Sequence, residues 1–275
     1  MNIDFIILAA GKGTRMGGDS PKVLANLAGK PMIQHLIDTI DSFPKSSTSI
    51  IVGHKAKEVE TGISSSKKIN FIHQKKQLGT AHAVKQALPY LKKNSISLIL
   101  YGDVPLVEKT TLKKLINSAA KGNLSLLTFI KDDPTGYGRI IRGSKSSVQK
   151  ITEHKDATNQ EKQIKEVNSG IMAVKSDLLQ KLLPAIKNQN AAKEYYLTDL
   201  VEIANASSIK VGATICDAYE VGGANDRQEL HDLERALQKK IASSLLQKGV
   251  TVADTARLDI RGDTKIGQGS FVDIN

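Results

Sequence analysis

Alternating apolar and helix-period segments over the first 130 residues limit the folds open to this chain most strongly. Apolar runs that predict strands lie at 4–9, 48–52, 69–72, 97–101 and 124–130. Segments with helical spacing lie between them, at 31–42, 55–61, 79–91 and 108–120. Strands that alternate with helices in this way form a mostly parallel sheet covered by helices on both faces. We therefore predict an α/β fold with a Rossmann-like, doubly wound sheet.

The pattern changes from about residue 137. The stretches "GRIIR", "VQKITEH" and "VNSGIMAVK" alternate apolar and polar residues, which predicts an antiparallel extension facing the same crevice as the parallel strands. A helix at 196–205 and a strand at 211–217 follow. A long helix is predicted over 226–247, since leucines and an isoleucine form one apolar stripe there.

The last residues have a different period. Apolar residues recur every six positions among glycines, which is the period of hexapeptide β-helix repeats. These residues are Ile260, Ile266 and Val272. We predict one domain over 1–225, a linker helix over 226–249, and the incomplete beginning of a left-handed β-helix over 250–275. An irregular amphipathic tail is the alternative, because so few repeats are present.

Charge and cysteine content restrict partners and location. The chain has 39 Lys and Arg against 28 Asp and Glu, a net charge of +11, which suits anionic ligands of several kinds. Aromatic residues make up only 4% and there is no Trp, so we expect no nucleic-acid partner. No apolar stretch approaches the roughly 20 residues of a membrane span, so we expect no membrane partner. The single Cys216 excludes an intramolecular disulfide and suits the cytoplasm.

The first predicted strand leads directly into a loop of glycines and bases, "FIILAAGKGTRMGGDSPKVL" at 5–24. Gly11 and Gly13 allow backbone N–H groups to approach an anion. Three positive charges follow closely, on Lys12, Arg15 and Lys22. A Walker A loop is excluded, because no Lys-Ser or Lys-Thr pair ends the glycine spacing, and the dinucleotide fingerprint has Met16 at its third glycine position. The loop therefore predicts a polyanion site of another kind.

A second polar stretch, "YGDVP" at 101–105, follows another predicted strand. Ligands of open α/β sheets bind beyond the carboxyl ends of the strands. We therefore expect Asp103 and the 11–22 loop to meet in one crevice. Asp103 alone could equally form an Asx-turn before Pro105.

A longer set of motifs resembles one enzyme family. In order, they are "LAAGKGTRM", "PKVL", "QLGTAHAV", "YGDVPL", "GYGRI", "EHKDAT", "NSGI", "EYYLTDL" and "GGANDRQEL". They resemble the bacterial N-acetylglucosamine-1-phosphate uridylyltransferases, which are sugar nucleotidyltransferases, over nearly all of residues 1–250. The resemblance implies Mg²⁺-assisted, in-line attack of N-acetylglucosamine-1-phosphate on the α-phosphorus of UTP, giving UDP-N-acetylglucosamine and pyrophosphate.

The resemblance also implies roles for individual residues. The catalytic cations would be Lys22 and Arg15, and the Mg²⁺ ligands Asp103 and Asn225. Contacts to UTP would come from Leu8, Ala9, Ala10, Gly11, Gln74, Gly79 and Thr80, with Gln77 as a further candidate. Contacts to the sugar would come from Tyr101, Gly138, Glu153, Asn168, Tyr196 and Thr198. From position alone, Asn225 could instead cap the following helix, with Gln228 completing a capping box.

In the family resembled, this domain precedes a hexapeptide-repeat acetyltransferase domain. Residues 258–275 supply at most one coil of such a domain. We therefore expect no acetyltransferase activity in this chain, and a homotrimer only where the full β-helix is present.

Three alternative functions stay open at this stage. The loop and Asp103 would equally serve a related nucleotidyltransferase with another nucleotide or sugar phosphate. A non-catalytic nucleotide-sensing module could keep the same fold. The positive charge also leaves an RNA-binding role, which low aromatic content disfavours.

Overall fold

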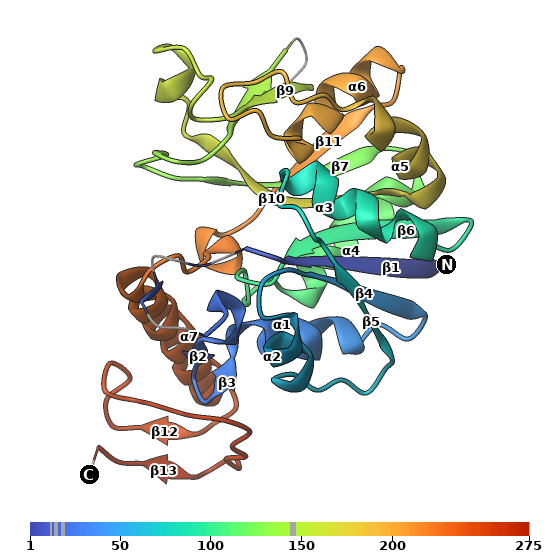
Figure 1. Ribbon diagram of the computed structural model, residues 1–275. Helices are drawn as coiled ribbons and strands as arrows, with labels where there is room; N and C mark the ends of the chain where they lie inside the picture. The colour runs from blue at the N-terminus through green and yellow to red at the C-terminus, as the bar shows by residue number, and fades with distance from the viewer. Residues whose placement is uncertain (12, 14–15, 18–19, 144–146, 275) are drawn as a thin grey trace.

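A central sheet organises the molecule (Figure 1). The computed structural model describes residues 1–274 except 12, 14–15, 18–19 and 144–146. The sheet order is β11-β7-β10-β6-β1-β4-β5, and β1 pairs in parallel with both β4 and β6. The strands are β1 (Asn2–Ala9), β4 (Ser46–Val52), β5 (Ile69–His73), β6 (Ser95–Tyr101), β7 (Leu124–Ile130), β10 (Glu166–Lys175) and β11 (Val211–Ile215). The predicted α/β fold with a mostly parallel sheet is confirmed.

Helices cover both faces of the sheet, because alternate residues of the buried strands point to opposite sides. Ile7 of β1 packs in one core with Leu36 and Leu112, whereas its neighbour Ile6 packs in the other with Val84. The helices are α1 (Met32–Asp41), α2 (Ala56–Thr61), α3 (Thr80–Ala87), α4 (Lys109–Ala120), α5 (Ser176–Leu182) and α6 (Leu200–Ala206). Short 3₁₀ helices lie at Lys22–Leu24, Leu88–Tyr90, Glu161–Gln163, Leu183–Ala185, Leu197–Asp199 and Ala218–Val221. No helix in the described part of the chain is long and apolar enough to cross a membrane.

The antiparallel strand β10 lies inside the sheet and not beside it. It pairs antiparallel with β6 on one side and with β7 on the other. The sequence predicts the antiparallel direction but not this central position. The hairpin of β8 (Arg139–Arg142) and β9 (Val148–Thr152) extends from β10 through the pair Val167 and Arg139. This arrangement places the residues of the extension beside those of the parallel half.

Two further elements are absent from the sequence prediction. One is α5, which follows β10 directly. The other is a small hairpin of β2 (Asn26–Leu27) and β3 (Lys30–Pro31), which turns through Ala28 and Gly29 with positive φ angles. Each strand of this hairpin has two residues, too few for a period-2 pattern to appear in the sequence.

The long helix α7 (Arg227–Gln247) begins with a cap that differs from the predicted one. The side chain of Asp226 accepts a hydrogen bond from the Glu229 backbone N–H at 2.9 Å. The Glu229 carboxylate in turn accepts from the Asn225 backbone N–H at 2.6 Å. The capping box of Asn225 and Gln228 is therefore wrong, since the cap lies one residue later. The Asn225 side chain is left free for another contact.

We expect Asp226→Ala to lower the free energy of unfolding by about 1 kcal/mol, the usual loss when an N-cap side chain is removed. Urea denaturation of both proteins measures this difference. Gln228→Ala serves as the matched control, because the Gln228 side chain, among the described residues, hydrogen-bonds Asp232 on the exposed side of the helix and not the helix start. An equal loss in the control would contradict the assignment of the cap.

The tail after α7 makes one turn and returns to its own start. Strand β12 (Thr251–Val252) pairs in parallel with β13 (Phe271–Val272), as Figure 1 shows beyond the end of α7. Gln238 of α7 holds this turn. Its side-chain amide donates a hydrogen bond to the Ile260 C=O and accepts one from the Ile260 N–H, each at 2.8 Å. The residues of the six-residue period are half-buried, namely Ile260, Ile266 and Val272. The beginning of a left-handed β-helix stays a prediction.

Candidate active site

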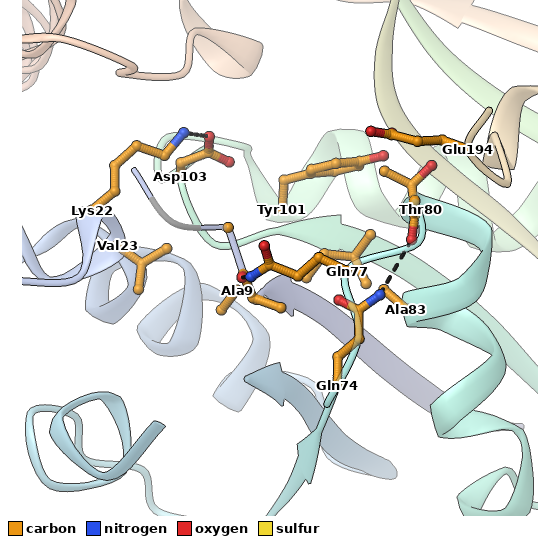
Figure 2. A pocket seen from close by; sticks show the side chains of 14 residues that line it. Ala9, Lys22, Val23, Gln74, Gln77, Thr80, Ala83, Tyr101, Asp103 and Glu194 are labelled. Atoms are coloured by element: carbon orange, nitrogen blue, oxygen red, sulfur yellow. Dashed lines mark hydrogen bonds and ion pairs between the residues drawn. The ribbon is translucent and has the colours of Figure 1, made fainter. Parts of the chain in front are cut away.

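A cavity of about 260 Å³ opens at the carboxyl ends of β1 and β6 (Figure 2). Its lining comes from the end of β1, from the loop after β6 and from the start of α3. All the residues predicted to contact the nucleotide line it, namely Leu8, Ala9, Ala10, Gly11, Gln74, Gly79 and Thr80. Lys22, Tyr101 and Asp103 line it as well. The structure thus brings one complete predicted set of residues into a single cavity.

At one end of the cavity, a lysine side chain donates hydrogen bonds to side-chain oxygens of two residues that are far apart in the sequence. The Lys22 ammonium donates to the carboxylate of Asp103 and, at 2.9 Å, to Oδ1 of Asn225. The side chains of Lys22 and Asp103 are only 14% and 21% exposed, so this pair is partly withdrawn from water. Among the described residues, the Asp103 carboxylate accepts from Lys22 and from no backbone N–H, so the alternative Asx-turn is not seen, and a backbone bond from Val104 N–H to Tyr101 C=O closes the turn at 3.0 Å.

The glycine loop approaches this cluster closely. A Cβ atom on Gly13 would lie 2.5 Å from Cβ of Lys22, and Gly13 has a φ of +61°. Only glycine fits this position without a shift of the lysine segment. The predicted catalytic residue Arg15, and Lys12 beside it, lie outside the described residues. Their roles stay predictions.

At the other end of the cavity, two glutamines are fixed by backbone carbonyls. Gln74 is 6% exposed, and its amide nitrogen lies 3.3 Å from the Gly79 carbonyl oxygen and 2.9 Å from Nδ1 of His82. Gln77 donates to the carbonyl of Ala10 at the end of β1. Both side chains line the cavity, so both can face a bound ligand.

Gly79 crosses the backbone of Tyr195 at the start of α3. Its φ is +114°, and a Cβ atom there would lie 2.5 Å from the carbonyl oxygen of Tyr195 and 2.7 Å from its nitrogen. The crossing is held by bonds from Tyr195 N–H to Leu78 C=O and from Ala81 N–H to Tyr195 C=O, each 2.9 Å. The backbone geometry therefore requires glycine here on two grounds.

We expect Gly79→Ala to weaken nucleotide binding by at least tenfold and to lower the melting temperature. The added Cβ would overlap backbone atoms of Tyr195, and a backbone segment cannot move aside as easily as a flexible side chain. Calorimetric titration with UTP and a thermal melt measure the two effects. Gly136→Ala is a suitable control. Gly136 also has a positive φ, of +85°, but a Cβ there meets nothing within 4 Å. Equal effects from both substitutions would show that φ strain alone, and not the crossing at Tyr195, explains the result.

The residues predicted for the sugar form a second cluster. Thr198 donates to the carboxylate of Glu153 at 3.0 Å, and a Cβ on Gly138 would lie 3.5 Å from the same carboxylate. The Asn168 backbone N–H donates to Gly138 C=O at 2.9 Å. Among the described residues, Oδ1 of Asn168 is buried without a hydrogen-bond partner. Burial raises the pKa of the Tyr196 hydroxyl, and the charges of Asp156 and Glu153 raise it further.

Tyr101 connects the cavity with this second cluster. Burial raises the pKa of its hydroxyl, and the charges of Glu153 and Asp103 raise it further. Its ring leaves no room for a side chain at Gly170, where a Cβ would lie 2.5 Å away.

Burial also raises the pKa of the Glu153 carboxyl, and the charge of Asp156 adds to the effect, while the hydrogen bond from Thr198 opposes it. The site therefore has the Lys22–Asp103 ion pair at one end and the acceptors of Glu153 and Asn168 at the other.

Sequence reasoning missed several residues of the site. Val23, Ala83 and Glu194 also line the cavity, and His82 contacts Gln74 from behind it. Glu194 and His82 both lie in motifs quoted above, "EYYLTDL" and "QLGTAHAV". A signal was therefore present in the motifs, but nothing in the residue types distinguished these two from exposed helix and loop residues.

A doubly wound sheet with a glycine loop, a lysine and a carboxylate around one cavity at its carboxyl edge defines a class of α/β nucleotide-binding proteins. Residues 5–167 match the MobA-like NTP transferase domain, and the chain belongs to this family.

Curated relatives align with the whole chain. It is 46% identical over 276 aligned positions to the bifunctional protein GlmU of Idiomarina loihiensis. It is 42% identical to the bifunctional protein GlmU of Francisella tularensis subsp. novicida. Each alignment includes 100% of this chain and 60% of the relative, so the chain spans about three fifths of the length of these proteins.

Solved structures share the fold. A UDP-glucose pyrophosphorylase complexed with UDP-glucose superposes with a TM-score of 0.69 at 16% identity, covering 87% of this chain and 100% of that chain. A putative glucose-1-phosphate thymidylyltransferase from Bacillus anthracis superposes with a TM-score of 0.65 at 19% identity, covering 86% and 94%. At such low identity, these similarities describe the fold alone.

Proposed function

We propose that the protein transfers the uridylyl group of UTP to N-acetylglucosamine-1-phosphate, forming UDP-N-acetylglucosamine and pyrophosphate. The observation that carries the proposal is the meeting of Lys22, Asp103 and Asn225 at the cavity lined by every residue predicted for UTP. The family and the relatives named GlmU support a nucleotidyl transfer. The order of motifs in the sequence supports UTP and the N-acetylated sugar as the substrates.

The reaction joins two anions, so charge compensation is its main requirement. A phosphate oxygen of the sugar phosphate forms a bond to the α-phosphorus of UTP, while the bond from that phosphorus to the pyrophosphate oxygen breaks in line. Lys22 would leave its two oxygen partners and neutralise charge on the α-phosphate and the leaving group. The glycine loop would supply backbone N–H groups to the triphosphate.

Asp103 and Asn225 are suited to hold a divalent cation. Both already present oxygens to one cation, the Lys22 ammonium, from segments that are far apart in the sequence. No group of three or more His, Cys, Asp or Glu residues in the described chain could hold a metal ion. Mg²⁺ commonly needs only one or two protein carboxylates, because phosphates and water complete its coordination. Bound there, Mg²⁺ would neutralise charge on the phosphates.

The second cluster would hold the sugar. The half-buried Glu153 carboxylate and the buried Oδ1 of Asn168, which has no hydrogen-bond partner among the described residues, are acceptors for hydroxyl and amide donors. A sugar that lacks a matching donor would leave these acceptors unpaired, which disfavours its binding. Tyr101, Tyr196, Thr198 and Gly138 would complete this half of the site, as the sequence predicts.

Pyrophosphate release from UTP, Mg²⁺ and N-acetylglucosamine-1-phosphate tests the proposal. Parallel reactions with glucose-1-phosphate, and with dTTP, CTP or GTP in place of UTP, test the choice of substrates. We expect release to require both substrates and to be fastest with the proposed pair. No release with any pair would refute the enzyme, whereas faster release with another pair would assign the chain to a related transferase.

A further inference from the structure

The orientation of the Gln74 amide is fixed by its surroundings. The Gly79 carbonyl, 3.3 Å from the amide, can only accept a hydrogen bond, so the group that faces it must be the NH₂. The same nitrogen lies 2.9 Å from Nδ1 of His82. Its two hydrogens are therefore used within the protein. In Figure 2 the amide oxygen lies on the side away from the Gly79 contact, and it is the atom left for a ligand.

His82 acts on this amide from outside the nucleotide cavity. Gln74 lines that cavity, whereas His82 lines a neighbouring cavity of about 380 Å³ together with Lys85 and Lys187. Nδ1 of His82 accepts from the Gln74 amide in the tautomer that carries the ring proton on Nε2. In that tautomer the Gln86 amide nitrogen, 3.3 Å from Nε2, donates to the backbone carbonyl of His82 at 3.1 Å and not to the ring. Burial lowers the pKa of His82, and the charge of Lys85 lowers it further, so the ring is held in the neutral form that can accept.

We propose that His82 is a positioning residue that fixes the Gln74 amide with only its oxygen toward the base, and that it thereby selects a pyrimidine carrying an N3–H. This inference rests on the proposed function, in which Gln74 contacts uracil. Uracil offers an N3–H donor to the amide oxygen. Cytosine has an unprotonated N3 there, so two acceptors would face each other and one hydrogen bond would be lost.

Substitutions at His82 distinguish this role from a merely structural one. His82→Leu removes the shorter of the two contacts to the Gln74 NH₂ and leaves only the 3.3 Å contact to the Gly79 carbonyl, so the amide can turn its NH₂ toward the base more easily. His82→Asn keeps an oxygen acceptor close to the position of Nδ1 and should largely restore the native behaviour. Gln86→Leu is the matched control, because the Gln86 amide touches the same ring at Nε2, 3.3 Å away, on the side that does not face Gln74.

The measurements are the dissociation constants of UTP and CTP by calorimetry, and KM and kcat for each nucleotide. We expect His82→Leu to lower the preference for UTP over CTP about tenfold, the effect of one misplaced hydrogen bond. The change should appear in the dissociation constant and in KM, with kcat nearly unchanged. His82→Asn and Gln86→Leu should both keep most of the wild-type preference.

An unchanged UTP to CTP ratio in His82→Leu overturns the inference, as does an equal loss in Gln86→Leu. A loss of kcat with an unchanged ratio would show a structural role and overturn it as well. Binding separates this inference from the proposed function. If the wild-type protein binds UTP without releasing pyrophosphate, the proposed function fails, and the binding ratio in His82→Leu still decides the role of His82.

Discussion

Replacing Asp103 by alanine is expected to lower the rate of pyrophosphate release at least ~10²-fold, the usual cost of one preorganised electrostatic contact in an active site. Two functions would be lost together. Asp103 holds the Lys22 ammonium in place, and with Asn225 it forms the oxygen pair proposed for Mg²⁺. Asn225 alone is a neutral ligand and would hold a divalent ion poorly. Initial rates across a series of Mg²⁺ concentrations measure the effect.

Asp38→Ala is the matched control for this substitution. Asp38 also accepts a hydrogen bond from a lysine, Lys30, at 2.9 Å, but its side chain is 44% exposed and lies outside the cavity. We expect its activity to equal that of the wild type. Near-normal activity of Asp103→Ala at millimolar Mg²⁺ would contradict the role assigned to Asp103.

Replacing Lys22 by alanine is expected to lower kcat by ~10²-fold or more while KM for UTP changes less, because its charge matters most as negative charge shifts to the leaving pyrophosphate. Lys22→Arg should not restore full activity, since a guanidinium cannot reproduce a compact ammonium held between two oxygens. A rise in KM for UTP with unchanged kcat would instead assign Lys22 to binding alone.

The same variant allows a measurement without turnover. In the absence of UTP, Lys22 occupies both oxygens that are proposed to hold the metal. Its removal should therefore strengthen binding of Mn²⁺ as a Mg²⁺ probe, measured by electron paramagnetic resonance of the free ion. Lys30→Ala, which removes an ammonium elsewhere, should leave Mn²⁺ binding unchanged. Weaker Mn²⁺ binding in Lys22→Ala would contradict the shared use of the two oxygens.

Periodicity and motif order predicted the parallel half of the fold and most of the residues that line the cavity at the carboxyl ends of β1 and β6. Strands such as β1 are buried on both faces, so their continuous apolar runs are visible in the sequence. The position of β10 was not predictable in this way, because alternation reports which side chains are buried and not which strand is the neighbour. The capping box failed for a similar reason, since Asp226 and Glu229 offer the same spacing one residue later than Asn225 and Gln228.

The orientation of side chains is even harder to predict from the sequence than the order of strands. The residue type alone allows Gln74 to offer either a donor or an acceptor to a base, and only the carbonyl of Gly79 and the ring of His82 decide between them. In the same way, the hydrogen bonds from Lys22 to Asp103 and Asn225 form only because the three chain segments that carry these residues lie together in the folded protein. The motif resemblance predicted that these groups belong to one site, but not that the Lys22 ammonium donates to both Asp103 and Asn225.

The central place of β10 has a consequence for synthesis on the ribosome. The cavity residues up to Asp103 are made first, yet β7 pairs only with β10 and β11 among the described strands, and both are made later. Until Glu166–Lys175 emerges, β6 keeps one unpaired edge that is rich in Ile and Leu, which is a site for wrong association with other chains. β10 also carries Asn168 of the sugar cluster. A nascent chain therefore joins the two halves of its sheet and gains Asn168 in the same step, while β11, Tyr196 and Thr198 follow later.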